Sequence, residues 1–123
     1  MGFSAGGILS GEMLLNFDEM TPVPMAHFKG GVGTLQARPY DDGNCKVLQM
    51  TLPQGTSIGL HTHEGSCEMI FVLSGEGICL DDGEEYPFRP GMCHYCPEGH
   101  SHSVFNTGSE PLVLLGVVPN LQK

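Results

Sequence analysis

Short stretches of alternating apolar and polar residues, each followed by a turn signal, occupy most of this chain from residue 34 onward. The stretch CKVLQMTL shows the alternation, because it places Leu48 and Met50 on one face and Val47 and Gln49 on the other. Turn-type segments separate such stretches, among them DDGN, PQGT, SGEG and DDGE. Many short strands at close spacing are typical of an all-β sandwich or barrel rather than a bundle of helices.

The alternating stretches predict about eight or nine strands within one domain. The length of 123 residues is that of a single domain, and the 18 Gly and 9 Pro agree with frequent turns. Residues 1–31 lack the alternation. We expect them to form an irregular N-terminal arm, a loop or edge segment with a short helix over 12–17, and we expect residues 32–120 to form the β-barrel domain. The strands are predicted at residues 34–40, 45–52, 57–63, 67–73, 78–80, 84–88, 92–96, 102–106 and 111–118.

The charge of the chain argues against two classes of partner. The net charge is −9, and the five Lys and Arg residues are scattered along the sequence. Binding to nucleic acids or to anionic membrane surfaces requires clustered positive charge. We therefore expect neither a nucleic acid nor a membrane as a partner.

Cysteine usage and the N-terminal sequence predict a cytoplasmic protein. The five cysteines are an odd number without a regular framework, which argues against a disulfide scaffold and for a reducing compartment. The start, MGFSAGGILSGEMLLNF, lacks the positively charged region of a signal peptide. No apolar stretch approaches the length that spans a bilayer.

A group of histidines with one glutamate interrupts the strand pattern in GTSIGLHTHEGSCEMIFVLSG. His61 and His63 lie two residues apart on one strand, so their side chains point to the same face. Glu68 begins the next strand after a short bend, and it can return to that face if the two strands pair. A second stretch, GMCHYCPEGHSHSVFN, adds His102 near the start of a strand. Three neutral imidazoles and one carboxylate suit one divalent transition metal ion, such as Zn, Fe, Ni, Mn or Cu.

Three other interpretations of residues in these two stretches are possible. An exposed strand face with two polar residues would explain His61 and His63 taken alone, but a buried polar cluster with further partners favours metal binding. A zinc knuckle or a redox pair would explain the C-x-x-C formed by Cys93 and Cys96. Strand residues three apart face opposite sides, and a redox pair needs a helix N-terminus where Pro97 instead predicts a turn.

The two stretches together resemble the sequence pattern of the cupin family. The first fits G-x5-H-x-H-x4-E-x6-G and the second fits G-x5-P-x-G-x2-H-x3-N, with every specified position matched in order. The resemblance covers about residues 45–118 and implies a double-stranded β-helix, or jelly roll, with a metal inside the barrel near its open mouth. In that family the metal ligands are the positions matched here by His61, His63, Glu68 and His102. The other matched positions are Gly55, Gly75, Gly91, Pro97, Gly99 and Asn106.

The resemblance predicts the metal site and leaves the reaction open. Four protein ligands on an octahedral ion leave two positions for water or substrate. The family includes dioxygenases, oxalate-degrading enzymes, isomerases, lyases and plain binding proteins. We expect a metal-dependent enzyme that acts on a small oxygen-rich molecule, such as a carboxylate, an enediol or a sugar derivative. The alternative is a small-molecule binding or sensing protein in which the metal anchors a ligand without turnover. The resemblance also implies a homodimer, and a dimer would cover the sheet edges of an open jelly roll.

Four residues are candidates for a role beside the metal, namely His94, Tyr95, His100 and Arg38. The first three lie near His102 in the sequence. One of them could act as a general base or orient a ligand imidazole, whereas the alternative is an exposed rim or a packed strand residue. Alternation alone does not decide which of His94 and Tyr95 faces inward. Arg38 could bind a substrate carboxylate from an early strand, or it could lie in a surface salt bridge.

Overall fold

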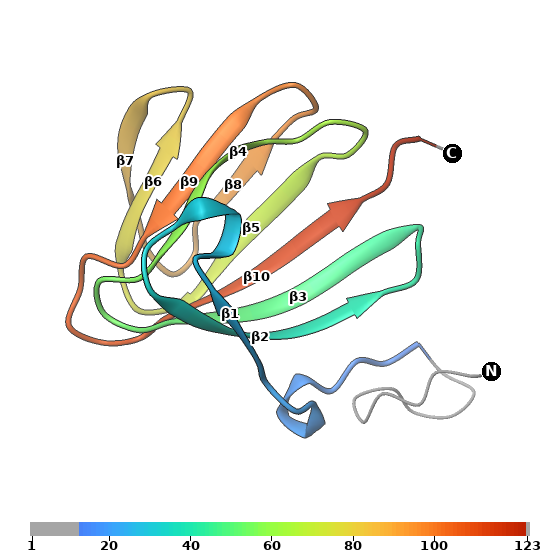
Figure 1. Cartoon of the computed structure of the whole chain (residues 1–123), viewed down its shortest axis with the longest axis horizontal. Helices are drawn as coiled ribbons and strands as arrows, with labels where there is room; N and C mark the ends of the chain where they lie inside the picture. Colours follow the sequence, from blue (N-terminus) through green and yellow to red (C-terminus); the bar gives the residue numbers. More distant parts are fainter. Residues whose placement is uncertain (1–12, 123) are drawn as a thin grey trace.

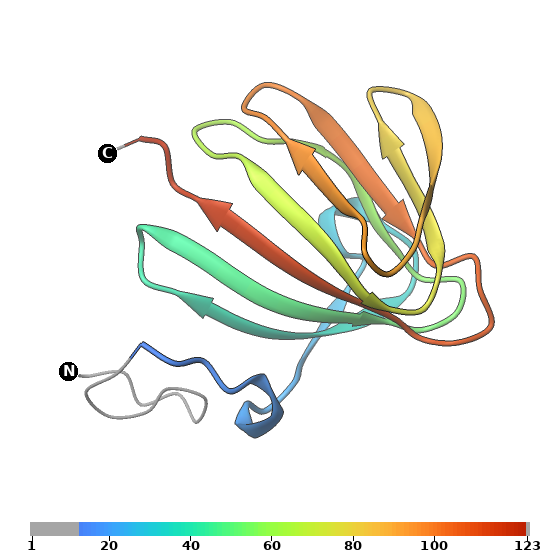
Figure 2. The same ribbon diagram turned by 180° about the vertical axis from the view of Figure 1, so that it is seen from behind.

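Two antiparallel β-sheets face each other in the computed structural model, which describes residues 13–122 (Figure 1). The six-stranded sheet has the order β1-β2-β3-β10-β5-β8, and the four-stranded sheet has the order β4-β9-β6-β7. The view from behind brings β5 and β8 to the front (Figure 2). The all-β architecture expected from the alternation is confirmed. The strands are β1 (Val23–Ala26), β2 (Thr34–Asp41), β3 (Cys45–Leu52), β4 (Ser57–Thr62), β5 (Glu68–Ser74), β6 (Gly77–Asp81), β7 (Glu84–Phe88), β8 (Cys93–Cys96), β9 (Ser101–Phe105) and β10 (Leu112–Pro119).

The strands expected from residue 34 onward are all present, as β2 to β10. Part of the expected arm is an edge strand, because β1 pairs with β2. The helix expected over 12–17 is wrong for its described residues, where the 3-10 turn η1 (Phe17–Glu19) follows Asn16 instead. The Asn16 side chain accepts a hydrogen bond from the Asp18 amide at 3.1 Å, a local bond that favours a turn over a longer helix. A second 3-10 turn is η2 (Phe28–Gly30), and no helix within residues 13–122 could cross a membrane.

Aliphatic side chains fill one end of the space between the sheets. Met50 on β3, Leu114 on β10 and Ile58 on β4 are each no more than 2% exposed and belong to a single cluster of buried residues. Toward the other end, the inward positions of the same strands no longer carry large apolar side chains. They are Lys46 on β3 and Gly116 on β10. The packed end therefore holds the sheets together, and the other end leaves room for polar groups.

The turn between β9 and β10 depends on the buried side chain of Asn106. Its Nδ2 donates to the carbonyl oxygens of Leu52 at 2.8 Å and Glu110 at 2.9 Å. Its Oδ1 accepts from the Gly108 amide at 2.9 Å. These bonds join the turn to the end of β3, so the asparagine of the second motif has a structural role.

Candidate metal centre

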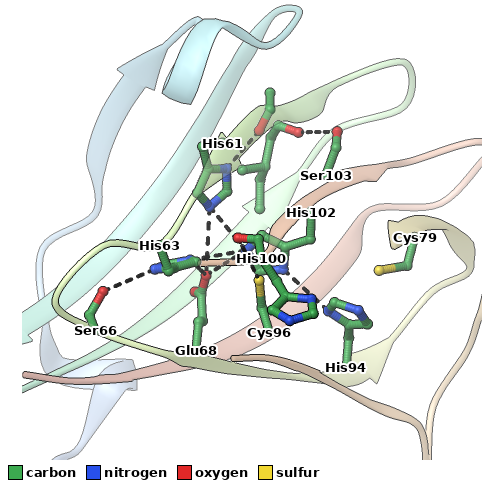
Figure 3. Close-up of polar contacts among 12 residues, drawn as sticks. His61, His63, Ser66, Glu68, Cys79, His94, Cys96, His100, His102 and Ser103 are labelled. Carbon is green, nitrogen blue, oxygen red and sulfur yellow. Dashed lines mark hydrogen bonds and ion pairs between the residues drawn. The ribbon is translucent and has the colours of Figure 1, made fainter. Parts of the chain in front are cut away.

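Strand pairing brings the four expected ligands to one place inside the barrel. His61 of β4 lies opposite His102 of β9 in the four-stranded sheet. Glu68 is the first residue of β5 in the facing sheet, and His63 follows the end of β4. The four side chains point toward one another (Figure 3). They form one group of metal-type ligands within residues 13–122, and their ligand atoms all lie within 4.8 Å of one another. We call them the His/Glu cluster.

The distances within the His/Glu cluster fit a single metal ion. Oε1 of Glu68 is 2.9 Å from Nε2 of His63, 3.0 Å from Nε2 of His102 and 3.8 Å from Nε2 of His61. Nε2 of His102 is also 3.1 Å from that of His63 and 3.0 Å from that of His61. Two ligand atoms bound at right angles to one ion, with bonds of about 2.0–2.1 Å, would lie about 3 Å apart. Four of these five distances match that spacing, and the distance of 3.8 Å between Glu68 and His61 is wider.

The outer nitrogens of two rings have partners that orient them. Nδ1 of His61 lies 2.7 Å from the carbonyl oxygen of Gly59. A carbonyl can only accept, so this nitrogen carries the hydrogen, and Nε2 of His61 presents its lone pair to the cluster. Nδ1 of His63 lies 3.2 Å from the Ser66 hydroxyl. Partners of this kind hold metal-binding histidines in the correct orientation.

Burial and hydrogen bonding set the charge states of the two most enclosed members. His102 is fully buried, and Glu68 is 6% exposed. Burial lowers the pKa of His102, although the Glu68 carboxylate acts in the opposite direction. Burial alone would raise the pKa of Glu68, but the polar interactions of its carboxylate with the rings of His102, His61 and His63 bring it well below its usual range. Both directions favour a neutral imidazole and a charged carboxylate at neutral pH, which are the forms that bind a metal.

A cavity of about 130 Å³ opens onto the His/Glu cluster. Leu48, Met50 and Ile58 supply apolar lining, and Lys29 and Lys46 supply charge. These two lysines are among only five Lys and Arg residues in a chain whose net charge is −9. An otherwise acidic protein thus places positive charge beside the candidate metal site.

The position of Lys29 depends on close contact between η2 and β4. Lys29 has a positive φ of 56°, a left-handed conformation that is uncommon for a residue other than glycine. A Cβ atom at Gly31 would collide with the backbone of Ser57, and one at Gly59 would collide with the Lys29 carbonyl. The two backbones therefore touch at these glycines, which fixes η2 beside the cavity.

Gly116 is a part of the site that the sequence analysis missed. It lies on β10, and a Cβ atom at this position would be 2.9 Å from Oε2 of Glu68. Because glycine has no side chain, this position leaves the space in which the Glu68 carboxylate lies. The sequence did contain a signal, because a single Gly within the apolar strand LVLLGVV indicates a close approach to the backbone.

The candidate residues of β8 and the turn after it differ in orientation. His94 points into the barrel, with a side chain that is 13% exposed, whereas Tyr95 is 57% exposed on the other face. His100 is half exposed, and its Nδ1 lies 2.9 Å from Oδ2 of Asp82. Neither Tyr95 nor His100 lines the cavity beside the His/Glu cluster. His94 does not line that cavity either, but its Nδ1 lies 3.2 Å from Nδ1 of His102, so it is the member of this set that approaches the cluster.

Arg38 lies away from the cavity. Its neighbours Leu35 and Ala37 are fully buried on the inner face of β2, and alternation places Arg38 on the outer face. There its Nη1 donates to Oε1 of Gln49 at 3.1 Å. Of the two alternatives for Arg38, a position inside the barrel and a surface salt bridge, this placement on the outer face disfavours the first.

The two thiols of the C-x-x-C diverge, as strand alternation predicts. Cys96 is 1% exposed and its thiol lies 3.4 Å from the His100 carbonyl oxygen, whereas Cys93 is exposed. Burial raises the pKa of Cys96 to about 11 and that of Cys79 to about 12. All five cysteines are free, and none belongs to the metal-type group found within residues 13–122. The zinc-knuckle and redox interpretations therefore gain no support.

Comparison with known proteins agrees with this fold. The family model described as cupin domain matches residues 48–118. The chain is 33% identical over 112 residues to the oxalate-binding protein of Thermotoga maritima, covering 86% of this chain and 93% of that protein. A crystal structure of a predicted oxalate decarboxylase from Thermotoga maritima has a TM-score of 0.84 at 33% identity, covering 89% of this chain and 100% of the other. A sugar phosphate isomerase of the cupin superfamily from Silicibacter pomeroyi has a TM-score of 0.65 at 25% identity, covering 70% of this chain and 59% of the other. The motifs, the two facing sheets and these matches together show that the chain belongs to the cupin family.

Proposed function

We propose that the protein binds a divalent transition metal ion at the His/Glu cluster and, beside it, a small dicarboxylate such as oxalate. The observation that carries this proposal is the cavity, whose lining includes members of the cluster and two of the few cationic residues of an acidic chain. The metal, when bound, supplies a Lewis acid with free positions for carboxylate oxygens. Lys29 and Lys46 supply charge that attracts and orients the anion.

The size of the cavity favours a small ligand. The cavity beside the cluster measures about 130 Å³. Pockets for larger organic ligands usually measure about 300–1,000 Å³. Oxalate, which is two carboxylates joined directly, suits the smaller volume better than a sugar phosphate does. The name of the Thermotoga maritima oxalate-binding protein supports the same choice of ligand.

Binding without turnover is the function that the cavity supports best. Apart from the cluster, the polar side chains among its described lining residues are Lys29, Lys46 and Ser66. None of these is a carboxylic acid or an imidazole, the usual groups for general acid–base catalysis. Turnover, which the sequence led us to expect first, is the second candidate. It is supported by the open cavity beside the cluster and by the description of the related Thermotoga maritima structure as a predicted oxalate decarboxylase.

Replacing Lys46 by methionine is expected to weaken oxalate binding by the Zn²⁺-loaded protein about tenfold. A hydrogen bond to a charged group contributes about 1.5–3 kcal/mol, and 1.4 kcal/mol is a factor of ten in affinity. Isothermal titration calorimetry measures the change, with Zn²⁺ affinity measured separately. Arg38→Met is the matched control, since it removes one positive charge from the outer face of the sheet. An equal loss in both variants would mean that net charge, rather than the cavity, governs binding.

Recovery of the ligand separates binding from turnover. The protein is loaded in turn with Zn²⁺, Mn²⁺, Fe²⁺, Ni²⁺ or Cu²⁺ and incubated with oxalate. A raised melting temperature with oxalate recovered unchanged supports binding, because a ligand that binds the folded state stabilises it. Conversion of oxalate supports the enzymatic candidate. No stabilisation and no conversion with any of these metals would contradict both.

We also propose that two copies associate through the outer face of the six-stranded sheet. Phe71, Leu73 and Tyr95 are 40%, 47% and 57% exposed on this face, and Leu115 of β10 lies opposite Phe71. Exposed apolar groups gathered on one face mark interaction sites. We expect sedimentation velocity at micromolar concentration to show a dimer and Phe71→Arg to shift it toward the monomer. A wild-type monomer would contradict this proposal.

A further inference from the structure

A fourth imidazole lies directly against the His/Glu cluster. Nδ1 of His94 is 3.2 Å from Nδ1 of His102, and the two ring centroids are 5.3 Å apart (Figure 3). His94 comes from β8 in the six-stranded sheet and reaches across the interior to β9. Its contact is made with the outer nitrogen of His102, because Nε2 of His102 faces Glu68. His94 therefore adjoins the candidate metal site without belonging to it.

The short contact between the two rings constrains where their hydrogens lie. Two ring nitrogens form a hydrogen bond only if one carries the hydrogen and the other offers a lone pair. If Nδ1 of His102 donates to His94, then Nε2 of neutral His102 holds a lone pair that faces the cluster. In the reverse arrangement Nε2 of neutral His102 carries a hydrogen that points into the cluster. A metal ion at the cluster is compatible with the first arrangement alone.

The first arrangement places a hydrogen on Nε2 of His94, and a carboxylate lies close to it. This nitrogen is buried and has no hydrogen-bond partner in the described part of the chain. Oδ2 of Asp81 is 3.6 Å away, on a side chain that is 43% exposed and thus free to adjust. Asp81 of β6 and His61 of β4 both lie opposite His102 of β9, on its two sides. The sheet register therefore places this acceptor next to the metal ligand.

We propose that His94 and Asp81 are positioning residues for the metal ligand His102. His94 accepts from Nδ1 of His102 and donates through its own Nε2 to Asp81, so that the lone pair of the metal ligand points at the ion. This inference rests on the proposed metal site and adds two residues that do not touch the metal. Outer partners of this kind commonly change metal affinity by about 10–100-fold.

The His94→Phe variant removes the acceptor and keeps a ring of similar size. We expect it to bind Zn²⁺ about 10–100-fold more weakly than the wild type, as measured by competition with a chelator. His94→Asn keeps an acceptor oxygen near the position of Nδ1, and it is expected to recover most of the affinity. If the ring of His94 served only to fill space, His94→Asn would not recover the Zn²⁺ affinity.

Asp81→Asn tests the last hydrogen bond of the series from His102 through His94 to Asp81. The Asp81 side chain is not part of the core. We expect this variant to lose Zn²⁺ affinity, but by a smaller factor than His94→Phe does. Asp82→Asn is the matched control, because Asp82 also pairs with a histidine, His100, but at the surface. We expect the control to bind Zn²⁺ as the wild type does. An equal loss in both aspartate variants would contradict a specific role for Asp81.

Nitrogen NMR of the histidine rings gives a readout that does not depend on affinity. In the Zn²⁺-loaded wild type, His94 is expected to carry its hydrogen on Nε2 and to leave Nδ1 as an acceptor. A hydrogen on Nδ1 of His94, or unchanged Zn²⁺ affinity in a folded His94→Phe variant, would overturn the inference and leave the metal site in place. A wild type that binds no Zn²⁺ would remove the metal site and this inference together.

Discussion

Replacing Glu68 by glutamine is expected to weaken Zn²⁺ binding by more than about 100-fold, because the loss of an outer partner alone already reaches that size. The carboxylate is the one negatively charged member of the cluster, and Oε1 lies within 3.8 Å of all three ring nitrogens. Glutamine keeps the shape and can still hydrogen-bond to the rings, but it cannot offset the charge of a dication. Competition with a chelator measures the affinity, and elemental analysis of the purified variant measures its metal content.

The matched control for this change is Glu64→Gln. Glu64 is exposed and lies four residues before Glu68, outside the cluster. It undergoes the same chemical change, and we expect Zn²⁺ affinity to stay within about twofold of the wild type, since exposed charges interact weakly. Metal content equal to that of the wild type in Glu68→Gln would mean that the four side chains meet for a reason other than metal binding.

Metal binding and folding are coupled, so the same variant has an effect on stability. An ion that binds the folded state at 100 times its dissociation constant adds about 2.7 kcal/mol to the free energy of unfolding. Zn²⁺ should therefore raise the melting temperature of the wild type and of Glu64→Gln, and leave that of Glu68→Gln nearly unchanged. The comparison separates the loss of a ligand from a general loss of structure.

The strands and the cluster followed from local patterns in the sequence. Alternation decides the face of each residue once a strand is assumed, which is why His61 and His63 were placed together correctly. The spacing from them through Glu68 to His102 matched two long motifs, so the meeting of residues far apart in the chain could be predicted. The register of β4 against β9, which brings His61 opposite His102, was not predicted, and the pairing considered between the strands of His63 and Glu68 does not occur, because β4 and β5 belong to different sheets.

Features that depend on contacts between distant segments and that lie outside the two motifs were not predicted. Alternation alone could not choose between His94 and Tyr95, because the phase of a four-residue strand depends on how it pairs with β5. The two lysines beside the cavity come from β3 and from η2, and η2 is placed by backbone contact with β4. Arg38 was considered for the interior because its strand was known but its face was not. Each of these outcomes was decided by packing between elements rather than by local sequence.

Leu114→Ala is expected to lower the free energy of unfolding by about 2–5 kcal/mol, the usual effect of truncating a buried leucine. Leu114 is fully buried on β10, where it lies opposite Met50 of β3 and Val72 of β5. The alanine variant loses apolar contacts with both neighbouring strands and leaves a cavity that a close-packed interior cannot easily fill. Single domains are stable by about 5–15 kcal/mol, so the loss is a large fraction of the total.

Urea denaturation of the metal-free protein measures this loss, with Leu60→Ala as the control. Leu60 is 64% exposed on β4, so its truncation should change stability by less than about 0.5 kcal/mol. Leu114 lies two residues from Gly116 on the same face of β10, and a Cβ atom at Gly116 would be 2.9 Å from Oε2 of Glu68, so the same variant also tests whether core packing affects the cluster. Zn²⁺ affinity within about threefold of the wild type in folded Leu114→Ala would mean that core packing at this position and metal binding are not coupled, since independent sites add within about 0.5 kcal/mol. A large loss of Zn²⁺ affinity in this variant would show instead that core packing sets the geometry of the cluster.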